Sequence, residues 1–229
     1  MSAEPSMRLS ALGHQIACQL GGDLPPQGPP PVRLPKVLSV EQCEALVKAA
    51  WQNTPHGTKQ QDRQAHRDRA LVLWLWGTGC RVSEMCCATV GDYDPIEGTC
   101  KVIGKGNRER LLYIPNRVVR AYNSYLALRG GPWANKQLPL FGSSKDDAKR
   151  LERFSVNRIL KRISEGINIH VTPHMFRHSC ATQLLQAGVA IDYVRAYLGH
   201  VRITTTQTYT HAIVSGAMRE ATTFHPAGR

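Results

Sequence analysis

The sequence has few acidic residues and no hydrophobic run long enough to cross a membrane. Its 229 residues include 17 Asp and Glu against 29 Lys and Arg, which gives a formal net charge of +12. The longest apolar run, Ala70–Trp76, is far shorter than the roughly 20 residues of a membrane helix. Residues 1–20 lack the basic start and apolar stretch of a secretion signal. We therefore expect a cytoplasmic protein with a polyanionic partner, and nucleic acid is the first candidate.

The cysteines also lack the spacing of disulfide or zinc-binding pairs. The seven cysteines are odd in number and include no CxxC pair, which excludes a disulfide framework and a zinc ribbon. Most of them lie among apolar residues, as Cys86 and Cys87 do, so we expect buried thiols in a reducing compartment. With 42% hydrophobic residues, the composition is that of an ordinary globular protein rather than a disordered or collagen-like chain.

The pattern of residues predicts a tail followed by one domain. Six prolines in the second half of residues 1–35 favour extended backbone, so this stretch is interpreted as a proline-rich tail or linker. Ser39 and Gln42 form a capping box at the first helix of a domain that covers residues 36–229. Apolar spacing predicts helices over 39–51, 62–76, 81–88, 116–128, 155–164, 173–186, 191–198 and 204–213.

Two stretches have the alternation of β-strands rather than helical spacing. Residues 99–103 and 110–114 flank the turn-forming, basic segment 104–108, and together they predict a β-hairpin. The predicted fold class is therefore α+β, mainly α with a small antiparallel β-sheet.

Five short motifs follow one another along this domain. They are Gly77–Glu84, Val102–Arg110, Thr172–His178, Leu198–His200 and Thr205–His211. In order and spacing they resemble the motifs of the tyrosine recombinases, the phage-integrase and Xer family. The resemblance covers about residues 36–215 and implies the fold of the tyrosine recombinase catalytic domain.

The resemblance also implies a function and a role for single residues. It implies a site-specific DNA recombinase or integrase that cleaves and rejoins strands through a 3′-phosphotyrosine intermediate. Tyr209 aligns with the nucleophile, and Glu84 matches an acidic residue that holds the site together. The other catalytic positions are Arg81, Lys105, His174, Arg177 and His200.

The chemistry of these residue types fits the same reaction without the family. A guanidinium fork offers paired donors to two oxygens of a phosphate, so Arg81 and Arg177 suit the charge of a pentacoordinate transition state. A tyrosine with a pKa of about 10 is a poor nucleophile at neutral pH unless a base such as His174 takes its proton. Lys105 at the hairpin tip is placed to protonate the leaving 5′ oxygen. The reaction requires neither a metal nor another cofactor.

Several of these residues also have a simpler interpretation. Arg81 and Glu84 have the spacing of a surface ion pair. Three basic hairpin residues, Lys105, Arg108 and Arg110, are predicted to bind nucleic acid, but solvated charges that protect a sheet edge are the alternative for Lys105 and Arg108. His174 and His178 have the spacing of two zinc ligands. Since Met175 stands where the zinc motif has glutamate and no third ligand is evident, we expect no metal site.

The expected partners are double-stranded DNA and further recombinase subunits. Members of the family usually have a core-binding domain before the catalytic one, and we expect that this domain is absent here. The protein is therefore expected to act as a homo-oligomer, a tetramer on DNA, or with a partner recombinase. Two alternatives stay open: a nicking-closing enzyme like the type IB topoisomerases, and a non-catalytic DNA-binding accessory protein or regulator with the same fold.

Overall fold

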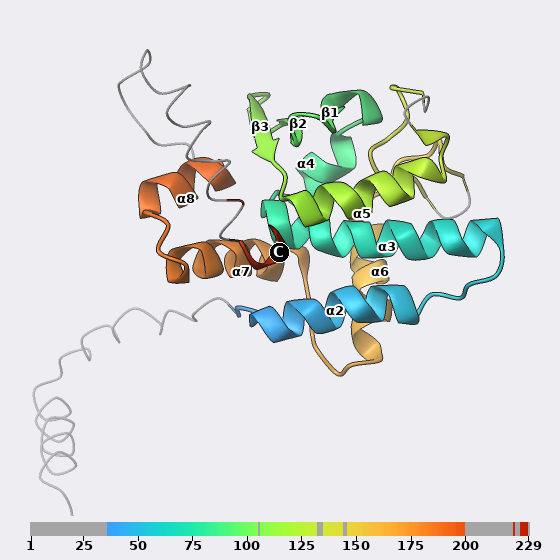
Figure 1. Cartoon of the computed structure of the whole chain (residues 1–229), viewed down its shortest axis with the longest axis horizontal. Coiled ribbons are helices and arrows are strands. Elements are labelled where there is room, and N and C mark those ends of the chain that lie inside the picture. Colours follow the sequence, from blue (N-terminus) through green and yellow to red (C-terminus); the bar gives the residue numbers. More distant parts are fainter. Residues whose placement is uncertain are drawn as a thin grey trace, which may run out of the picture. The chain divides into compact units, whose positions relative to one another are not determined.

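A computed structural model describes residues 36–104, 106–131, 135–143, 146–199, 222 and 225–228. Within these residues the protein is mainly helical with one small antiparallel sheet, which confirms the predicted fold class (Figure 1). Three predicted site residues, Lys105, His200 and Tyr209, lie outside the described residues, as does the helix predicted over 204–213. The domain boundary predicted at residue 35 stays a prediction.

The described elements follow the predicted order. They are α2 (Val40–Gln52), α3 (Lys59–Thr78), α4 (Val82–Cys87), the 3-10 helix η1 (Val90–Asp92), β1 (Tyr93–Asp94), β2 (Thr99–Ile103), β3 (Glu109–Tyr113), α5 (Asn116–Ala127), α6 (Arg153–Glu165), α7 (Pro173–Gln186), α8 (Ile191–Leu198) and the 3-10 helix η3 (Pro226–Gly228).

Side-chain caps explain where the first two helices begin. At α2, the Ser39 hydroxyl accepts from the Gln42 N–H at 3.2 Å and the Gln42 side chain accepts from the Ser39 N–H at 2.9 Å, so the predicted capping box is confirmed. The predicted start of the second helix at residue 62 is wrong by three residues. Thr58 and Gln61 form another capping box, which lets α3 begin in a polar stretch without apolar periodicity.

The predicted hairpin is confirmed, with a register that decides which side chains face inward. β2 and β3 pair antiparallel with Val102 opposite Arg110, and the Gly104 N–H donates to the Arg108 carbonyl at 2.8 Å to close the turn. A third strand, β1, was not predicted from the sequence. It is only two residues long and forms because it pairs with β2.

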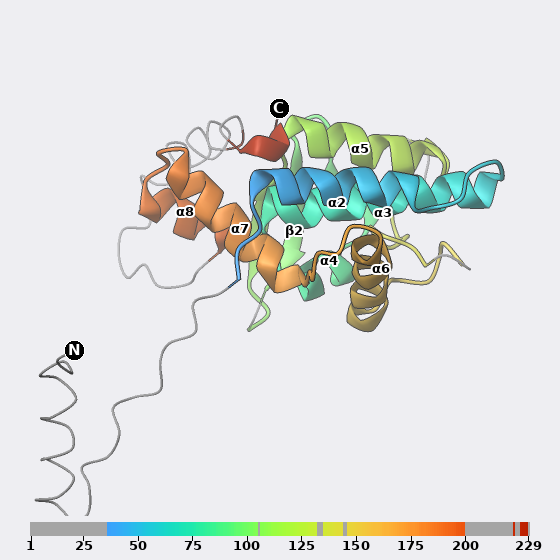
Figure 2. The ribbon, with the colours of Figure 1, turned by 90° about the horizontal axis from the view of Figure 1, so that it is seen from below.

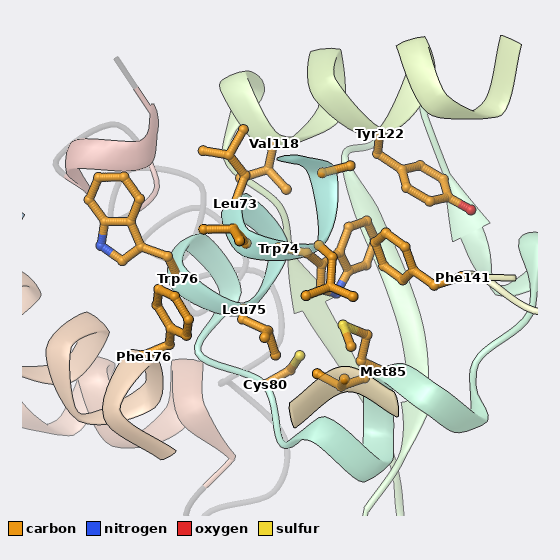
Figure 3. Packing of buried hydrophobic residues seen from close by; sticks show 14 of the residues in the cluster. Leu73, Trp74, Leu75, Trp76, Cys80, Met85, Val118, Tyr122, Phe141 and Phe176 are labelled. Atoms are coloured by element: carbon orange, nitrogen blue, oxygen red, sulfur yellow. The ribbon is translucent and has the colours of Figure 1, made fainter. Parts of the chain in front are cut away.

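The core is built around α3. This helix contacts α2, α5 and α7 (Figure 2). All of its residues from Ala70 to Thr78 are buried. Trp74 packs edge-on against Tyr122 and Phe141, with ring centroids 5.1 and 5.8 Å apart (Figure 3). The apolar run Ala70–Trp76 is therefore the buried second half of α3, at the centre of the domain.

A smaller apolar cluster joins α7 to α8. Its buried members are Cys180, Leu184, Val194, Tyr197 and Leu198. The Trp76 indole N–H donates to the Gln183 side chain at 2.7 Å, and the Tyr197 hydroxyl donates to the Gly77 carbonyl at 2.6 Å. These contacts fix α7 and α8 against the end of α3, where the Gly77–Glu84 motif begins.

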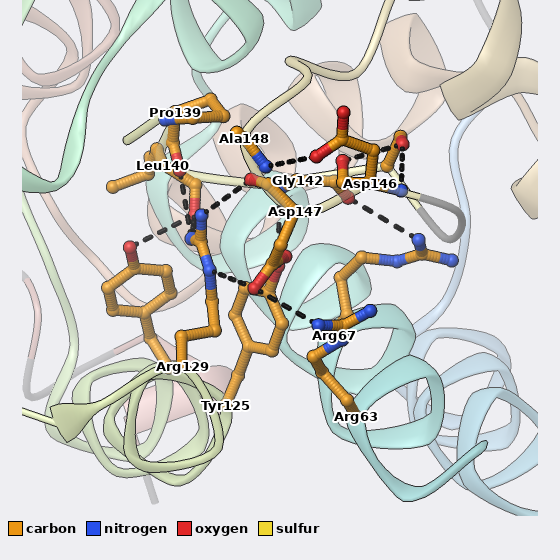
Figure 4. Close-up of polar contacts among 12 residues, drawn as sticks. Arg63, Arg67, Tyr125, Arg129, Pro139, Leu140, Gly142, Asp146, Asp147 and Ala148 are labelled. Carbon is orange, nitrogen blue, oxygen red and sulfur yellow. Dashed lines mark hydrogen bonds and ion pairs between the residues drawn. The ribbon is translucent and has the colours of Figure 1, made fainter. Parts of the chain in front are cut away.

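A polar network holds the segment between α5 and α6. The buried Arg129 guanidinium donates to Asp147 at 2.9 Å and to the Pro139 carbonyl at 2.8 Å, and the Tyr125 hydroxyl donates to Asp147 at 3.2 Å (Figure 4). Arg63 of α3 adds an ion pair with Asp147 at 3.4 Å. Because buried donors and acceptors must be paired, this network fixes Pro139 and Asp147 against α5.

The expectation of buried thiols is confirmed for five of the six cysteines that the structure describes. They are Cys43, Cys80, Cys86, Cys100 and Cys180. Cys87 is exposed, which corrects the expectation for that residue. Cys87 is the last residue of the short helix α4, which buries Glu84, Met85 and Cys86 but not Cys87.

Candidate active site around a buried glutamate

The turn between α3 and α4 places Arg81. Gly79 ends α3 in the left-handed conformation, with φ of 56°. A Cβ at this position would lie 2.5 Å from Leu198 and 3.0 Å from the Cys180 sulfur. Glycine therefore allows both the turn and the close approach of α7 and α8, and Arg81 follows as the N-cap residue of α4.

A buried carboxylate holds two arginines beside this turn. Glu84 is 1% exposed, accepts from the Arg81 backbone N–H at 2.7 Å and forms an ion pair with the Arg81 guanidinium at 3.0 Å. Arg110 of β3 makes a bidentate contact with the same carboxylate, at 3.2 and 2.9 Å. The surface ion pair considered from the sequence is thus part of a three-residue cluster around a buried carboxylate.

The arginines keep Glu84 ionised despite its burial. Burial alone raises the pKa of this carboxyl group, but the hydrogen bonds and charge of Arg110, together with the bonds from Arg81, outweigh burial and lower the pKa. The Arg81 side chain is 36% exposed, so it has room to contact a ligand as well as Glu84.

Arg177 lies in the same region and brings a further positive charge. It projects from α7, is 8% exposed, and donates to the carbonyls of Gly79 at 2.7 Å and Leu198 at 2.9 Å. Burial, followed by the charges of Arg81 and Arg110, lowers the pKa of this guanidinium to about 10. It stays protonated at neutral pH, and a bound anion would relieve the repulsion among the three cations.

The other predicted site residues that the structure describes, His174 and Arg108, are exposed side chains. His174 lies in the first turn of α7, three residues before Arg177, and its side chain is exposed. Arg108 is exposed at the hairpin turn. The structure therefore brings Arg81, Glu84 and Arg177 together and adds Arg110 from the hairpin, while the positions of Lys105, His200 and Tyr209 relative to them stay predictions.

Neither a metal-binding cluster nor a membrane-spanning helix is found in the part of the chain that the structure describes. No group of three or more His, Cys, Asp or Glu residues there is placed to hold one ion. No described helix is both long and apolar enough to cross a bilayer.

The ion-pair cluster gives a prediction about stability. We expect Glu84→Gln to lower the free energy of unfolding by about 3 kcal/mol near neutral pH, because it leaves Arg110 without a buried counter-charge. The folded-state pKa of Glu84 is lowered, so this contribution is present above the unfolded pKa and is lost as the pH falls through the folded pKa. Urea unfolding at about pH 7 and again at the lowest pH at which the protein stays folded measures the difference, which is expected to shrink as the pH falls.

A surface variant supplies the control for this prediction. Glu165 is 64% exposed and pairs with Lys161 at 3.8 Å, so Glu165→Gln is expected to change stability by less than about 1 kcal/mol at either pH. If Glu84→Gln destabilised the protein equally at both pH values, the charge of Glu84 would not be the cause.

Comparison with known proteins identifies the family. The sequence matches the phage integrase family over residues 36–215. It is 35% identical over 199 residues to the tyrosine recombinase XerC of Pelobacter propionicus, an alignment that covers 86% of this chain and 62% of that protein. The chain belongs to the phage integrase family, and the resemblance to tyrosine recombinases predicted from the motifs is confirmed. It spans less than two thirds of the length of this relative.

Solved structures show the same fold. The crystal structure of XerA recombinase matches with a TM-score of 0.61 and 25% identity, over 98% of this chain and 76% of that one. The XerH site-specific recombinase, bound to a palindromic difH substrate in a post-cleavage complex, matches with a TM-score of 0.60 and 25% identity, over 83% of this chain and 53% of that one.

Proposed function

We propose that this chain carries the catalytic domain of a site-specific DNA recombinase that cleaves and rejoins strands by transesterification. The observation that carries the proposal is the cluster in which Arg81 and Arg110 pair with the buried carboxylate of Glu84, with the charge of Arg177 close to all three. Three cations against one anion leave excess positive charge, which suits a DNA phosphate. Family membership and the DNA-bound XerH neighbour point to the same partner.

The proposed reaction uses the residues that the motifs identify. The Tyr209 oxygen attacks the scissile phosphorus, His174 accepts the phenolic proton, and the bond from phosphorus to the 5′ oxygen breaks. Lys105 protonates that leaving oxygen. Arg81 and Arg177 stabilise the charge that develops on the non-bridging oxygens, and His200 completes the set. The products are a 3′-phosphotyrosine and a free 5′-hydroxyl, so the reverse reaction can join another strand without ATP.

A covalent adduct is the direct test of this function. The probe is a pool of duplexes with randomised sequence on both sides of a nick, each with a 5′ label on the cut strand. Attack close to the nick releases a short fragment that diffuses away, which traps the adduct. We expect a labelled band that survives SDS and disappears after protease treatment, and its absence from the whole pool would count against the proposal.

Metal removal tests the chemistry separately. Because arginine side chains rather than a divalent ion are proposed to neutralise the transition state, adduct formation is expected to continue at an unchanged rate in EDTA. The assay compares initial rates with EDTA, with magnesium and with zinc. A strict requirement for either ion would contradict the proposed mechanism.

Assembly on DNA separates recombination from the nicking-closing alternative. We propose that the protein acts as an oligomer, a tetramer on paired sites, or together with a partner recombinase. Exchange of strands between two labelled duplexes is the expected product. Relaxation of a supercoiled plasmid without any exchange would instead identify a nicking-closing enzyme, and DNA binding without an adduct would identify an accessory protein.

A further inference from the structure

Arg110 faces the interior of the site rather than the solvent. In the hairpin register it pairs with Val102, and it shares the inner face of β3 with the buried Leu112. Its side chain is 16% exposed. The neighbouring strand residues Glu109 and Leu111 point outward and are exposed, as alternation along a strand requires.

Each nitrogen of the Arg110 guanidinium has a protein acceptor. Nε and Nη2 donate to the two oxygens of Glu84 at 3.2 and 2.9 Å, while Nη1 donates to the Tyr197 carbonyl at 3.1 Å. One side chain therefore joins β3, α4 and the C-terminal end of α8. Planar fork geometry makes arginine suited to this link, and lysine cannot reproduce it.

The end of α8 is shaped around this arginine. Gly199 caps α8 in the left-handed conformation, with φ of 69°. A Cβ on Gly199 would lie 2.6 Å from Cδ, 2.7 Å from Nε and 3.0 Å from Cζ of Arg110. The glycine of the Leu198–His200 motif is therefore needed twice, for the turn itself and for the close approach of Arg110.

Two arginines together satisfy the last carbonyls of α8. Arg110 donates to Tyr197 and Arg177 donates to Leu198, whose carbonyls have no partner within the helix. Positive charge at a helix C-terminus is also favourable for the helix dipole. The point at which the chain leaves α8 toward His200 is thereby tied to the same arginine that holds Glu84.

The charge of Arg110 has a separate effect on Arg81. Glu84 is the only acidic side chain that the described residues place in ion-pair contact with either arginine. Because Arg110 engages both carboxylate oxygens, it balances the charge of Glu84 and leaves the half-exposed Arg81 with positive charge for a ligand. Without Arg110, the buried carboxylate would neutralise Arg81 instead.

We propose that Arg110 is a positioning residue of the proposed cleavage site, and not a contact to DNA. It acts through Glu84 on Arg81 and through the C-terminus of α8 on the start of the following segment. This inference rests on the proposed DNA-cleaving function. It replaces the expectation, drawn from the basic hairpin, that Arg110 binds nucleic acid.

The first experiment separates positioning from DNA binding. Arg110→Ala and Arg110→Lys are compared with Arg108→Ala, which removes an exposed hairpin charge, and with Lys101→Ala, which removes a charge from the opposite face of the sheet. Affinity for a duplex of fixed sequence is measured against salt. If Arg110 itself bound a phosphate, its loss would lower the slope of log K against log salt by about 0.9 and leave the rate of adduct formation at saturating protein unchanged, whereas a loss of positioning lowers that rate.

The second measurement is the rate of adduct formation at saturating protein. Arg110→Ala is expected to slow it at least about tenfold, because misplacement of a reacting group by about 1 Å costs up to about 100-fold. Arg110→Lys restores the charge but not the fork, so it is expected to recover little of the rate. Lys101→Ala is expected to match the wild type.

A double-mutant cycle checks the contact independently of activity. Gly199→Ala is expected to lower Tm in the wild-type background, and to lower it less in Arg110→Ala, where the Cβ no longer meets the arginine stem. Equal losses of Tm in both backgrounds would show that the two residues are not coupled and would overturn the packing argument.

The outcomes keep this inference apart from the proposed function. If the wild type forms an adduct and Arg110→Ala forms it equally fast at saturation, with a smaller salt slope, Arg110 is a DNA contact and the inference fails alone. If the wild type forms no adduct with any member of the duplex pool, the proposed function fails and takes the inference with it.

Discussion

Tyr209→Phe is expected to abolish the covalent protein–DNA adduct and to leave DNA affinity unchanged. The substitution removes only the hydroxyl oxygen, which the proposed mechanism uses as the nucleophile, and no other atom of the ring takes part in the reaction. The adduct is measured on SDS gels with the nicked duplex pool, and affinity is measured by fluorescence anisotropy at the same salt concentration. Because no second nucleophile is proposed, the expected yield is zero rather than a reduced amount.

A second tyrosine provides the matched control. Tyr193 on α8 is 37% exposed, and Tyr193→Phe makes the same chemical change at a position outside the proposed site. That variant is expected to form the adduct at the wild-type rate. An adduct of normal yield in Tyr209→Phe would remove Tyr209 from the nucleophilic role and would direct attention to another hydroxyl group.

Local signals in the sequence were enough for most of the fold. The capping residue Ser39 marks a helix start that the structure confirms, since its side chain accepts from the backbone N–H of Gln42 in its own helix. The hairpin was also predictable, because its turn residues lie between two alternating stretches. The short strand β1 was not, since a two-residue strand has no periodicity and exists only through its pairing with β2.

The candidate site was predictable from the sequence only in part. Motif order placed Arg81, Glu84 and Arg177 in one site, and the structure brings them together. The sequence did not show that the Arg110 side chain faces the interior of the site, because its partners Glu84 and Tyr197 are 26 and 87 residues away in sequence. One signal was present: Arg110 shares its strand face with Leu112, and alternation places both on the same side.

Two interpretations of Lys105, as a residue that attracts DNA or as the general acid, predict different effects of its removal. If Lys105 only attracts DNA, Lys105→Ala weakens binding about equally for any duplex. If it protonates the leaving 5′ oxygen, binding is kept and the loss lies in cleavage, where general acid catalysis is worth about 10²- to 10⁴-fold. We expect the second result, measured as the rate of adduct formation at saturating protein.

A change in the leaving group identifies the acid directly. When sulfur replaces the bridging 5′ oxygen, the leaving group is a thiolate whose conjugate acid has a pKa near 8.5, by analogy with cysteine, so it departs without a proton. Lys105→Ala is therefore expected to cleave the 5′-phosphorothiolate duplex almost as fast as the wild type. Arg81→Ala and Arg177→Ala are the controls and should fail on both substrates, because the charge they stabilise lies on the non-bridging oxygens. An equal defect of Lys105→Ala on both duplexes would show that another group delivers the proton.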